Sequence, residues 1–247
     1  MNLRGNIVII TGGATGLGFA LAERLVAMGN EVIICGRRQA SLDAAKQKLP
    51  ALHTRVCDIA DEQSRREFCE WVESIFPNVN ILINNAGVQR KVDLKAGTGA
   101  LINDNDEVEI NLKAQIYLAE RFMPLLLKRK ESAIVNVSSG LGFVPIAAFP
   151  VYCATKAAIH SFTTSLRYQL RDTSLRVFEL IPPIIYDTEL KGKPLEKAEW
   201  NLSAKEVADA AIDGMRHDRY EIPVGPSKGL VNATDVEREQ AFRNMNH

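Results

Sequence analysis

The sequence predicts an α/β fold, in which one doubly wound domain over residues 1–247 has helices on both faces of a parallel sheet of about seven strands. Short β-branched runs alternate with longer stretches of helical periodicity, the order produced when crossover helices join parallel strands. Most of the short runs are apolar along their whole length, as strands covered on both faces are. A chain of 247 residues can bury one large core of this kind.

The expected strands cover residues 6–11, 31–35, 53–57, 81–84, 132–138, 176–181 and 220–224. The first run could be mistaken for the apolar part of a secretory signal. It breaks at Thr11-Gly12-Gly13, however, and Glu23 and Arg24 stand where a cleavage region would be expected. We therefore interpret it as the first strand.

Helices are indicated by apolar stripes and by capping patterns. Two stripes at helical spacing are Leu17, Leu21, Leu25 and Met28, and Ala158, Phe162, Leu166 and Leu170. Ser203 and Glu206 match a capping box that opens a helix to about residue 216, and Asp104 with Glu107 indicates another helix start. A last helix is expected over residues 235–244.

Composition excludes several classes of function. The 30 basic and 30 acidic side chains balance, which argues against a nucleic-acid partner. No apolar stretch approaches the roughly 18 residues needed to cross a bilayer, so no membrane partner is expected. The four cysteines lack CxxC spacing and predict reduced thiols in a cytoplasmic protein, and the four histidines form no ligand cluster, so no metal site is expected.

A glycine-rich turn separates the first strand from the first helix. In this position glycines permit a tight turn and a close approach of backbone to a diphosphate, which the helix N-terminus favours. The alternative is an ordinary flexible turn. The context favours a Rossmann-type dinucleotide site, with expected contacts at Thr11, Gly12, Gly13, Thr15, Gly16, Leu17 and Gly18.

The end of the second strand predicts which dinucleotide binds. An NAD site usually has a carboxylate about 20 residues beyond the glycine turn, and that position here is Gly36. Arg37 and Arg38 follow it, and a guanidinium can hold a 2′-phosphate with two parallel hydrogen bonds. The sequence thus predicts NADP(H), preferred over NAD(H), unless both arginines are merely solvated turn residues.

Tyr152 and Lys156 are four residues apart and would share one face of a helix. Lowering a phenol pKa from about 10 to near 7 takes about 4 kcal/mol. An ammonium about 4 Å away supplies about that much before desolvation is subtracted. Lysine alone is barely sufficient, so the cationic nicotinamide ring of an oxidised cofactor is expected to help. The spacing alone would also suit an ordinary helix face.

Further motifs stand in a fixed order along the chain. They are Asp58 after the third strand, Asn84-Asn85-Ala86-Gly87 after the fourth, Asn111 in EINLKA, and Ser139 thirteen residues before Tyr152. With the TGxxxGxG turn, they resemble the short-chain dehydrogenase/reductase family from about residue 5 to residue 183. The stretches NEVIICGRR and PVYCATKAAIHSF more specifically resemble a branch typified by an oxidoreductase encoded beside bacterial genes for D-alanylation of teichoic acids.

The resemblance implies hydride transfer between nicotinamide and a carbonyl or secondary alcohol substrate. It implies Tyr152 as proton donor and acceptor, Ser139 as hydrogen-bond donor to the same oxygen, Lys156 as the group that lowers the tyrosine pKa and binds ribose, and Asn111 as holder of a water chain. Further implied cofactor contacts are Asp58, Ile59, Asn85, Ala86, Gly87, Tyr152, Lys156, Pro182, Ile185 and Thr188. A homodimer or homotetramer is also implied.

The chain departs from the family pattern after the sixth strand. Pro182-Pro183 replaces the usual Pro-Gly, and Thr188 falls one residue late, which puts its cofactor contact in doubt. Residues 186–201, with Lys191, Lys193, Glu196 and Lys197, are either a polar lid or a solvated surface. Five apolar residues after Ser139 could wall a substrate pocket or pack against a partner subunit; they are Leu141, Phe143, Val144, Ile146 and Phe149.

Two other functions compete with the oxidoreductase. A non-catalytic NADP(H)-binding regulatory or scaffold protein would have no need to keep Asn111, Ser139, Tyr152 and Lys156 together. A sugar-nucleotide epimerase or dehydratase would need a larger C-terminal substrate region than this chain has.

Overall fold

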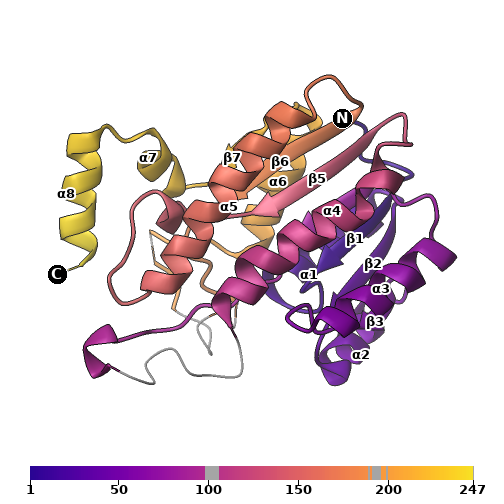
Figure 1. Ribbon diagram of the computed structural model, residues 1–247, viewed down its shortest axis with the longest axis horizontal. Helices are drawn as coiled ribbons and strands as arrows, with labels where there is room; N and C mark the ends of the chain where they lie inside the picture. Colours follow the sequence, from indigo (N-terminus) through magenta and orange to yellow (C-terminus); the bar gives the residue numbers. More distant parts are fainter. Residues whose placement is uncertain (98–105, 189, 191–195, 199, 247) are drawn as a thin grey trace.

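The computed structural model describes the chain apart from residues 98–105, 189, 191–195, 199 and 247. Its centre is a parallel sheet of seven strands in the order β3-β2-β1-β4-β5-β6-β7 (Figure 1). The strands are β1 Ile7–Thr11, β2 Glu31–Gly36, β3 His53–Val56, β4 Ile81–Asn84, β5 Ser132–Val137, β6 Leu175–Ile181 and β7 Glu221–Pro223. Each lies where the apolar runs predict it, with ends that differ by one residue at most.

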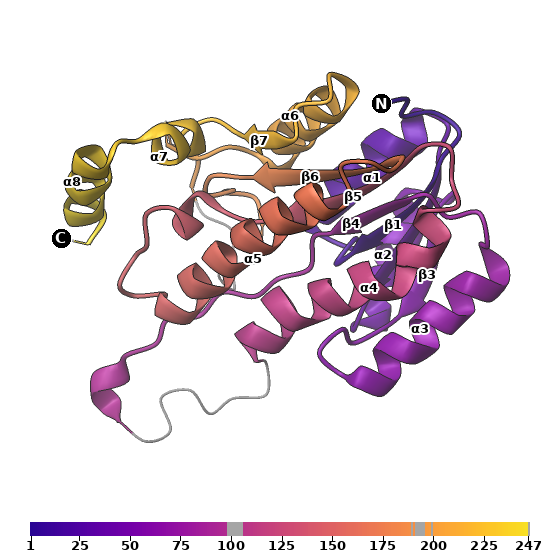
Figure 2. The same cartoon turned by 45° about the horizontal axis from the view of Figure 1, so that its top comes forward.

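Helices cover both faces of the sheet, as predicted. The helices are α1 Gly16–Ala27, α2 Gln39–Lys48, α3 Glu62–Ile75, α4 Ala114–Leu126, α5 Pro150–Gln169, α6 Ala204–Arg216, α7 Ser227–Asn232 and α8 Asp235–Met245. Helices α1, α2 and α6 pack on one face, and α3, α4 and α5 pack on the other (Figure 2). Helices α7 and α8 lie beyond the carboxyl ends of the strands (Figure 1).

Strands β1, β2 and β4 are mostly apolar because alternate side chains enter two separate cores. Val8 and Ile10 pack into the core under α1 and α6, whereas Ile9 between them packs into the core under α3 and α4. All three side chains are fully buried. Since every strand is parallel, all carboxyl ends meet at one edge of the sheet, and the loops that follow them can build one shared site.

The capping patterns fix where the later helices begin. Ser203 and Glu206 form the predicted capping box at the start of α6, and Thr234 and Glu237 form a second one at the start of α8. The predicted helix start at Asp104 lies outside the described residues. Asp106 instead accepts hydrogen bonds from the backbone amides of Val108 and Glu109, and helical structure begins at Glu107.

A π-helical turn, Glu109–Lys113, runs directly into α4. It is tied to α3 by Arg65, whose side chain is fully buried. The Arg65 guanidinium donates to Glu109 Oε1 at 2.8 Å and also to the backbone carbonyl of Ile59. Turns of this kind widen a helix locally and are frequent at functional sites. This one carries Asn111.

The two partners of the Arg65–Glu109 pair should contribute unequally to stability. Glu109→Ala leaves a buried guanidinium without its carboxylate and should lower the free energy of unfolding by about 3 kcal/mol or more. Arg65→Met should cost less, because Glu109 is 21% exposed and keeps its ion pair with Lys113. Urea denaturation measures both values. Lys113→Met, at an exposed position, is the control, and equal losses in all three variants would contradict the assignment.

Candidate active site

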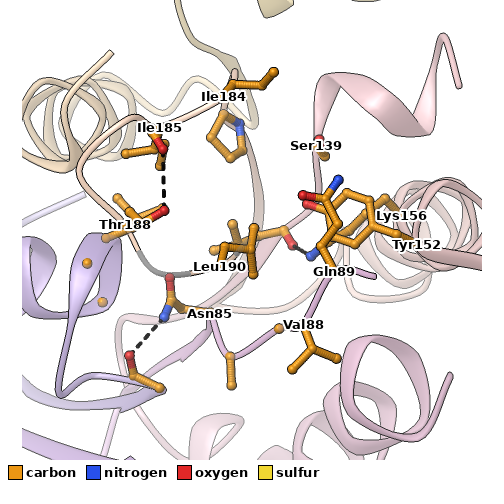
Figure 3. Close-up of a pocket in the computed structure, with 18 of the residues that line it drawn as sticks. Asn85, Val88, Gln89, Ser139, Tyr152, Lys156, Ile184, Ile185, Thr188 and Leu190 are labelled. Carbon is orange, nitrogen blue, oxygen red and sulfur yellow. Dashed lines mark hydrogen bonds between the residues drawn. The ribbon is translucent and has the colours of Figure 1, made fainter. Parts of the chain in front are cut away.

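The carboxyl edge of the sheet contains a cavity of about 1130 Å³, part of which Figure 3 shows. The residues that line it include nearly all those predicted from the sequence: Gly12, Thr15, Gly16, Leu17, Gly18, Arg37, Arg38, Asp58, Ile59, Asn85, Ala86, Gly87, Ser139, Tyr152, Lys156, Pro182, Ile185 and Thr188. Three further predicted residues, Thr11, Gly13 and Asn111, do not line the cavity, but Thr11 and Asn111 form hydrogen bonds with residues that do.

Four hydrogen bonds between the Thr11-Gly12 and Asn85-Ala86 segments, here called the joint, connect the ends of β1 and β4. The Thr11 hydroxyl accepts hydrogen bonds from the backbone amides of Asn85 and Ala86, both at 3.0 Å. In return the Asn85 amide group donates to the carbonyls of Thr11 at 2.9 Å and Gly12 at 3.3 Å. The glycine turn and the Asn-Asn-Ala-Gly turn are thereby fixed against each other.

The glycine turn is packed too closely for a side chain at two of its positions. A methyl group added at Gly13 would lie 2.4 Å from Ile34 Cγ2, and one at Gly18 would lie 2.3 Å from the Gly12 carbonyl oxygen. Gly16 has a φ of 53°, a conformation that glycine adopts without strain. These positions let α1 begin directly against the turn.

The start of α1 fits the diphosphate of a dinucleotide. Gly16, Leu17 and Gly18 open the helix and line the cavity. The N-cap residue Thr15 makes no side-chain capping bond, and the first turn holds no acidic residue. The first amide groups of the helix are therefore available to an anion, which the helix dipole also favours. Thr188, despite its late position in the sequence, reaches this turn, since its Cγ2 would lie 3.0 Å from a methyl group on Gly16.

The other end of the cavity is lined by the residues that follow β2 and β3. Arg37, Arg38 and Ser41 line it beside Gly36, and Asp58 lies across from them at the end of β3. Asp58 Oδ1 accepts from the backbone amide of Ala60 at 3.0 Å, which fixes its carboxylate in the local turn. The lining of this end is thus predominantly basic.

Tyr152, Lys156 and Ser139 lie together in the lining of the cavity (Figure 3). Lys156 Nζ donates to the carbonyl of Val137 at 2.8 Å and lies 5.5 Å from the centroid of the Tyr152 ring. Ser139 Oγ accepts from the Leu141 amide at 3.1 Å. The neighbouring Ser138 hydroxyl instead donates to Glu179 Oε1 at 2.5 Å. The thirteen-residue interval therefore selected the serine whose hydroxyl is not held by a carboxylate.

The protein's own groups raise the pKa of Tyr152 above its ordinary value. Burial is the main cause, and Cys153 and Glu107 add to it, while hydrogen bonding with the Ser139 side chain lowers it. The sequence predicted the opposite direction once an oxidised nicotinamide is bound. Since burial exceeds what the neighbouring groups supply, a lowered pKa would depend on a positive charge brought by the cofactor.

Lys156 has a pKa lowered to about 8, because its ammonium group is buried. The nearby carboxylate of Glu179 opposes this effect. Glu179 is fully buried on β6, where Ser138 donates to one carboxylate oxygen and His160 Nδ1 lies 2.8 Å from the other. The contacts with Ser138 and His160 therefore fix the position of the Glu179 carboxylate near Lys156.

Asn111, in the π-helical turn, connects Val88 and Thr155 by hydrogen bonds. Its Oδ1 accepts from the Val88 amide at 2.8 Å, and its Nδ2 donates to the Val88 carbonyl at 2.8 Å and to Thr155 Oγ1 at 3.2 Å. Asn111 is fully buried. It thus fixes the segment after the Asn-Asn-Ala-Gly turn against the helix that carries Tyr152 and Lys156.

The apolar wall differs in part from the prediction. Leu141 and Ile146 line the cavity, whereas Phe143, Val144 and Phe149 do not, and Phe143 packs on His160. Of the proposed lid, Lys191 and Lys193 lie outside the described residues. Glu196 and Lys197 do not line the cavity, but Leu190 and Trp200 in the same region do.

Sequence reasoning missed the lining that comes from Val88, Gln89 and Arg90 and from the C-terminal segment. Leu230, Asn244 and Met245 all reach the cavity from α7 and α8. Asn246 holds α8 there, since its side chain accepts from the Ala147 amide and donates to the Pro145 carbonyl. The adjacency of Gln89 and Arg90 to the Asn-Asn-Ala-Gly turn was a signal that could have identified them.

The fold and the cavity define a nucleotide-binding oxidoreductase of the Rossmann type. Residues 6–199 match the family described as short chain dehydrogenase. The chain belongs to this family.

Individual relatives support the same assignment. The chain is 47% identical, over all of its length and 98% of the relative, to the uncharacterized oxidoreductase DltE of Bacillus subtilis strain 168, which confirms the predicted branch. It is 30% identical, over 75% of each chain, to the NADP-dependent 3-hydroxy acid dehydrogenase YdfG of Escherichia coli K12. A short chain dehydrogenase/reductase of Burkholderia phymatum in complex with NAD shares the fold, with a TM-score of 0.81 and 20% identity over 100% of this chain and 97% of that one.

Three further observations concern the described part of the chain. No helix there is long and apolar enough to cross a membrane. Within the same residues no group of three or more histidine, cysteine, aspartate or glutamate side chains could hold a metal ion. Cys35, Cys57, Cys69 and Cys153 are free and buried.

The electrostatic link between Glu179 and Lys156 can be measured directly. Glu179→Gln removes the negative charge that favours the ammonium form, so the pKa of Lys156 should fall below its value of about 8. Heteronuclear NMR of the lysine side chain during a pH titration measures it. Glu221→Gln, on the neighbouring strand and paired with Arg167, is the control. An unchanged pKa in the Glu179 variant would show that this carboxylate does not influence the lysine.

Proposed function

We propose that the protein is an NADP(H)-dependent oxidoreductase that transfers hydride between nicotinamide and a carbonyl or secondary alcohol, with Tyr152 as general acid and base. The observation that carries the proposal is the meeting of Tyr152, Ser139 and Lys156 in the cavity that the glycine turn opens. The whole of residues 1–247 would then serve as one NADP-binding catalytic domain.

When bound, the nicotinamide cofactor supplies or accepts the hydride. The chain's own residues would handle the proton and the developing charge. The Tyr152 hydroxyl donates a proton to the carbonyl oxygen or removes one from the alcohol. Ser139 Oγ donates a hydrogen bond to the same oxygen and so stabilises the charge that forms on it.

Lys156 and Asn111 would support this proton transfer. With a pKa of about 8, Lys156 is predominantly protonated at neutral pH, and its ammonium group favours the ionised form of the phenol. Its remaining N–H groups could hold the ribose hydroxyls of the cofactor. Asn111 fixes the backbone around Val88, and we propose that it also orders the water that returns protons to solvent.

The preference for NADP(H) over NAD(H) rests on Arg37 and Arg38. Both line the end of the cavity beyond Gly36, where a carboxylate would select a ribose hydroxyl. A guanidinium there matches a 2′-phosphate. YdfG is named NADP-dependent, and a serine dehydrogenase that is 26% identical was solved with NADP+, which supports the same preference here.

We further propose a small-molecule substrate, a homodimer or homotetramer, and a cytoplasmic location. YdfG acts on a 3-hydroxy acid according to its name, which supports hydroxyl–carbonyl chemistry. A shallow apolar surface formed by Val108 and Leu112 at the π-helical turn and by Val151, Ala154 and Ala158 on α5 supports self-association, and four free thiols support a reducing compartment. A non-catalytic NADP(H)-binding protein of the same fold is the alternative.

Tyr152→Phe separates the enzyme from the non-catalytic alternative. It removes the hydroxyl and keeps the ring, so NADPH should still bind while kcat for carbonyl reduction falls by about 100-fold or more. A panel of carbonyl compounds with NADPH, followed at the absorbance of the reduced cofactor, measures it. Tyr168→Phe, an exposed tyrosine on the same helix, is the control. Turnover that survives in Tyr152→Phe would refute the role.

Replacing Arg37 and Arg38 together by alanine tests the cofactor preference. The dissociation constant for NADPH should rise by about 10- to 100-fold, since hydrogen bonds to a charged group contribute about 1.5 to 3 kcal/mol each. The constant for NADH should change little. Fluorescence titration with both cofactors measures it, with Arg66→Ala on α3 as control. Equal weakening of NADPH and NADH would mean that neither arginine contacts the phosphate.

A further inference from the structure

The part of the cavity around Tyr152 and Ser139, here called the substrate end, has a mostly apolar wall and one polar corner formed by Gln89 and Arg90. Leu141 and Ile146 line one side, and Leu230 and Met245 close it from the C-terminal helices. The segment that follows the Asn-Asn-Ala-Gly turn contributes Gln89 and Arg90 to the same lining. The proposed reaction does not itself need Gln89 and Arg90, because Tyr152 and Ser139 would bind the reacting oxygen.

Gln89 is a buried polar side chain whose amide group has no partner. It is 8% exposed, yet it makes no hydrogen bond with any other part of the chain that the structure describes. Figure 3 shows it reaching toward Tyr152 and Ser139 rather than toward Ile185 and Thr188. The amide atoms of Gln89 are not among the fully buried atoms that lack a partner, so they are open to the cavity and available to hydrogen-bond a ligand there.

Arg90 brings a positive charge to the same corner. Its Nη2 is buried and has no hydrogen-bond partner. Across the described residues the guanidinium forms no ion pair, although Glu107 is near. Glu107 Oε1 accepts from the backbone amide of Arg90 at 3.1 Å, and its carboxylate also interacts electrostatically with the Arg90 charge, although the two side chains form no ion pair. Glu107 itself does not line the cavity.

Hydrogen bonds fix the backbone of the segment that carries Gln89 and Arg90. Asn111 binds both backbone groups of Val88, Glu107 binds the amide of Arg90, and the amide of Val92 donates to the Ala148 carbonyl at 3.1 Å. Residues 88–92 are therefore fixed at three points. A guanidinium and an amide that both belong to the lining of one cavity match a carboxylate, which accepts several hydrogen bonds and pairs with one positive charge.

We propose that Gln89 and Arg90 form an anion subsite that binds a carboxylate of the substrate, so that the protein acts on oxo acids and hydroxy acids. This inference rests on the proposed function, because it assigns the second functional group of the molecule whose carbonyl meets Tyr152. Among the side chains that line this end in the described residues, Arg90 carries a positive charge beyond that of Lys156. A single carboxylate would balance it.

Paired substrates test the subsite separately from the chemistry. The probes are 2-oxo, 3-oxo and 4-oxo acids of four to six carbons and their methyl esters, each assayed for kcat/KM with NADPH. The wild-type protein should prefer one acid over its ester, and the favoured spacing reports the distance from Arg90 to the reacting carbon. Arg90→Met should reduce this acid-to-ester ratio by about 10- to 100-fold, mainly through KM, since charged hydrogen bonds are worth about 1.5 to 3 kcal/mol.

Further variants complete the design. Arg90→Lys should restore part of the ratio, and Gln89→Leu should reduce it less than Arg90→Met does. Lys91→Met, the exposed neighbouring charge that does not line the cavity, should keep it. A wild-type protein that reduces esters as well as acids, or a ratio unchanged in Arg90→Met, would overturn the subsite while leaving the proposed oxidoreductase intact.

Binding without turnover gives an independent measurement. Calorimetric titration of the NADPH-loaded Tyr152→Phe variant with the same acids and esters should show tighter binding of the acids. Introducing Arg90→Met into the Tyr152→Phe variant should abolish the difference in affinity between acids and esters. Equal binding of acid and ester, or no binding of any acid, would overturn the subsite whatever the fate of the proposed reaction.

Discussion

The joint between Thr11 and Asn85 is the constraint on which the site depends. The strand order reverses between β1 and β4, so the loops after these two neighbouring strands leave toward opposite faces of the sheet and open a crevice between them. Four hydrogen bonds across the joint keep that crevice at one width. The glycine turn, the first amides of α1 and the segment toward Gln89 all take their positions from it. Thr11 is itself buried and does not line the cavity, so its contribution is structural.

Burial dominates the electrostatics of the centre. It raises the pKa of Tyr152 and lowers that of Lys156, so each group is pushed toward its neutral form. Glu179 partly restores the charge on the lysine, and Ser139 partly offsets the shift on the tyrosine. A site arranged in this way responds strongly to any charge that a ligand brings into it, because little solvent is present to screen that charge.

Much of the fold and of the cofactor end could be predicted from the sequence, because their signals are local. Short β-branched runs marked the seven strands, and a four-residue spacing brought Tyr152 and Lys156 to one helix face. The substrate end could not be predicted in the same way. Met245 reaches the cavity because Asn246 contacts a loop about 100 residues earlier in the chain, and no local pattern reports such a contact. The raised pKa of Tyr152 was also missed, since burial depends on the complete fold.

The attachment of α8 has a practical consequence for handling the protein. The helix has no buried residue, and its Asn246 is joined to the loop that borders the substrate opening. A purification tag joined to the C-terminal end of α8 would begin close to that opening and crowd it. The amino terminus lies well away from α8 (Figure 1), so an extension there would leave the entrance unobstructed for assays and crystallisation.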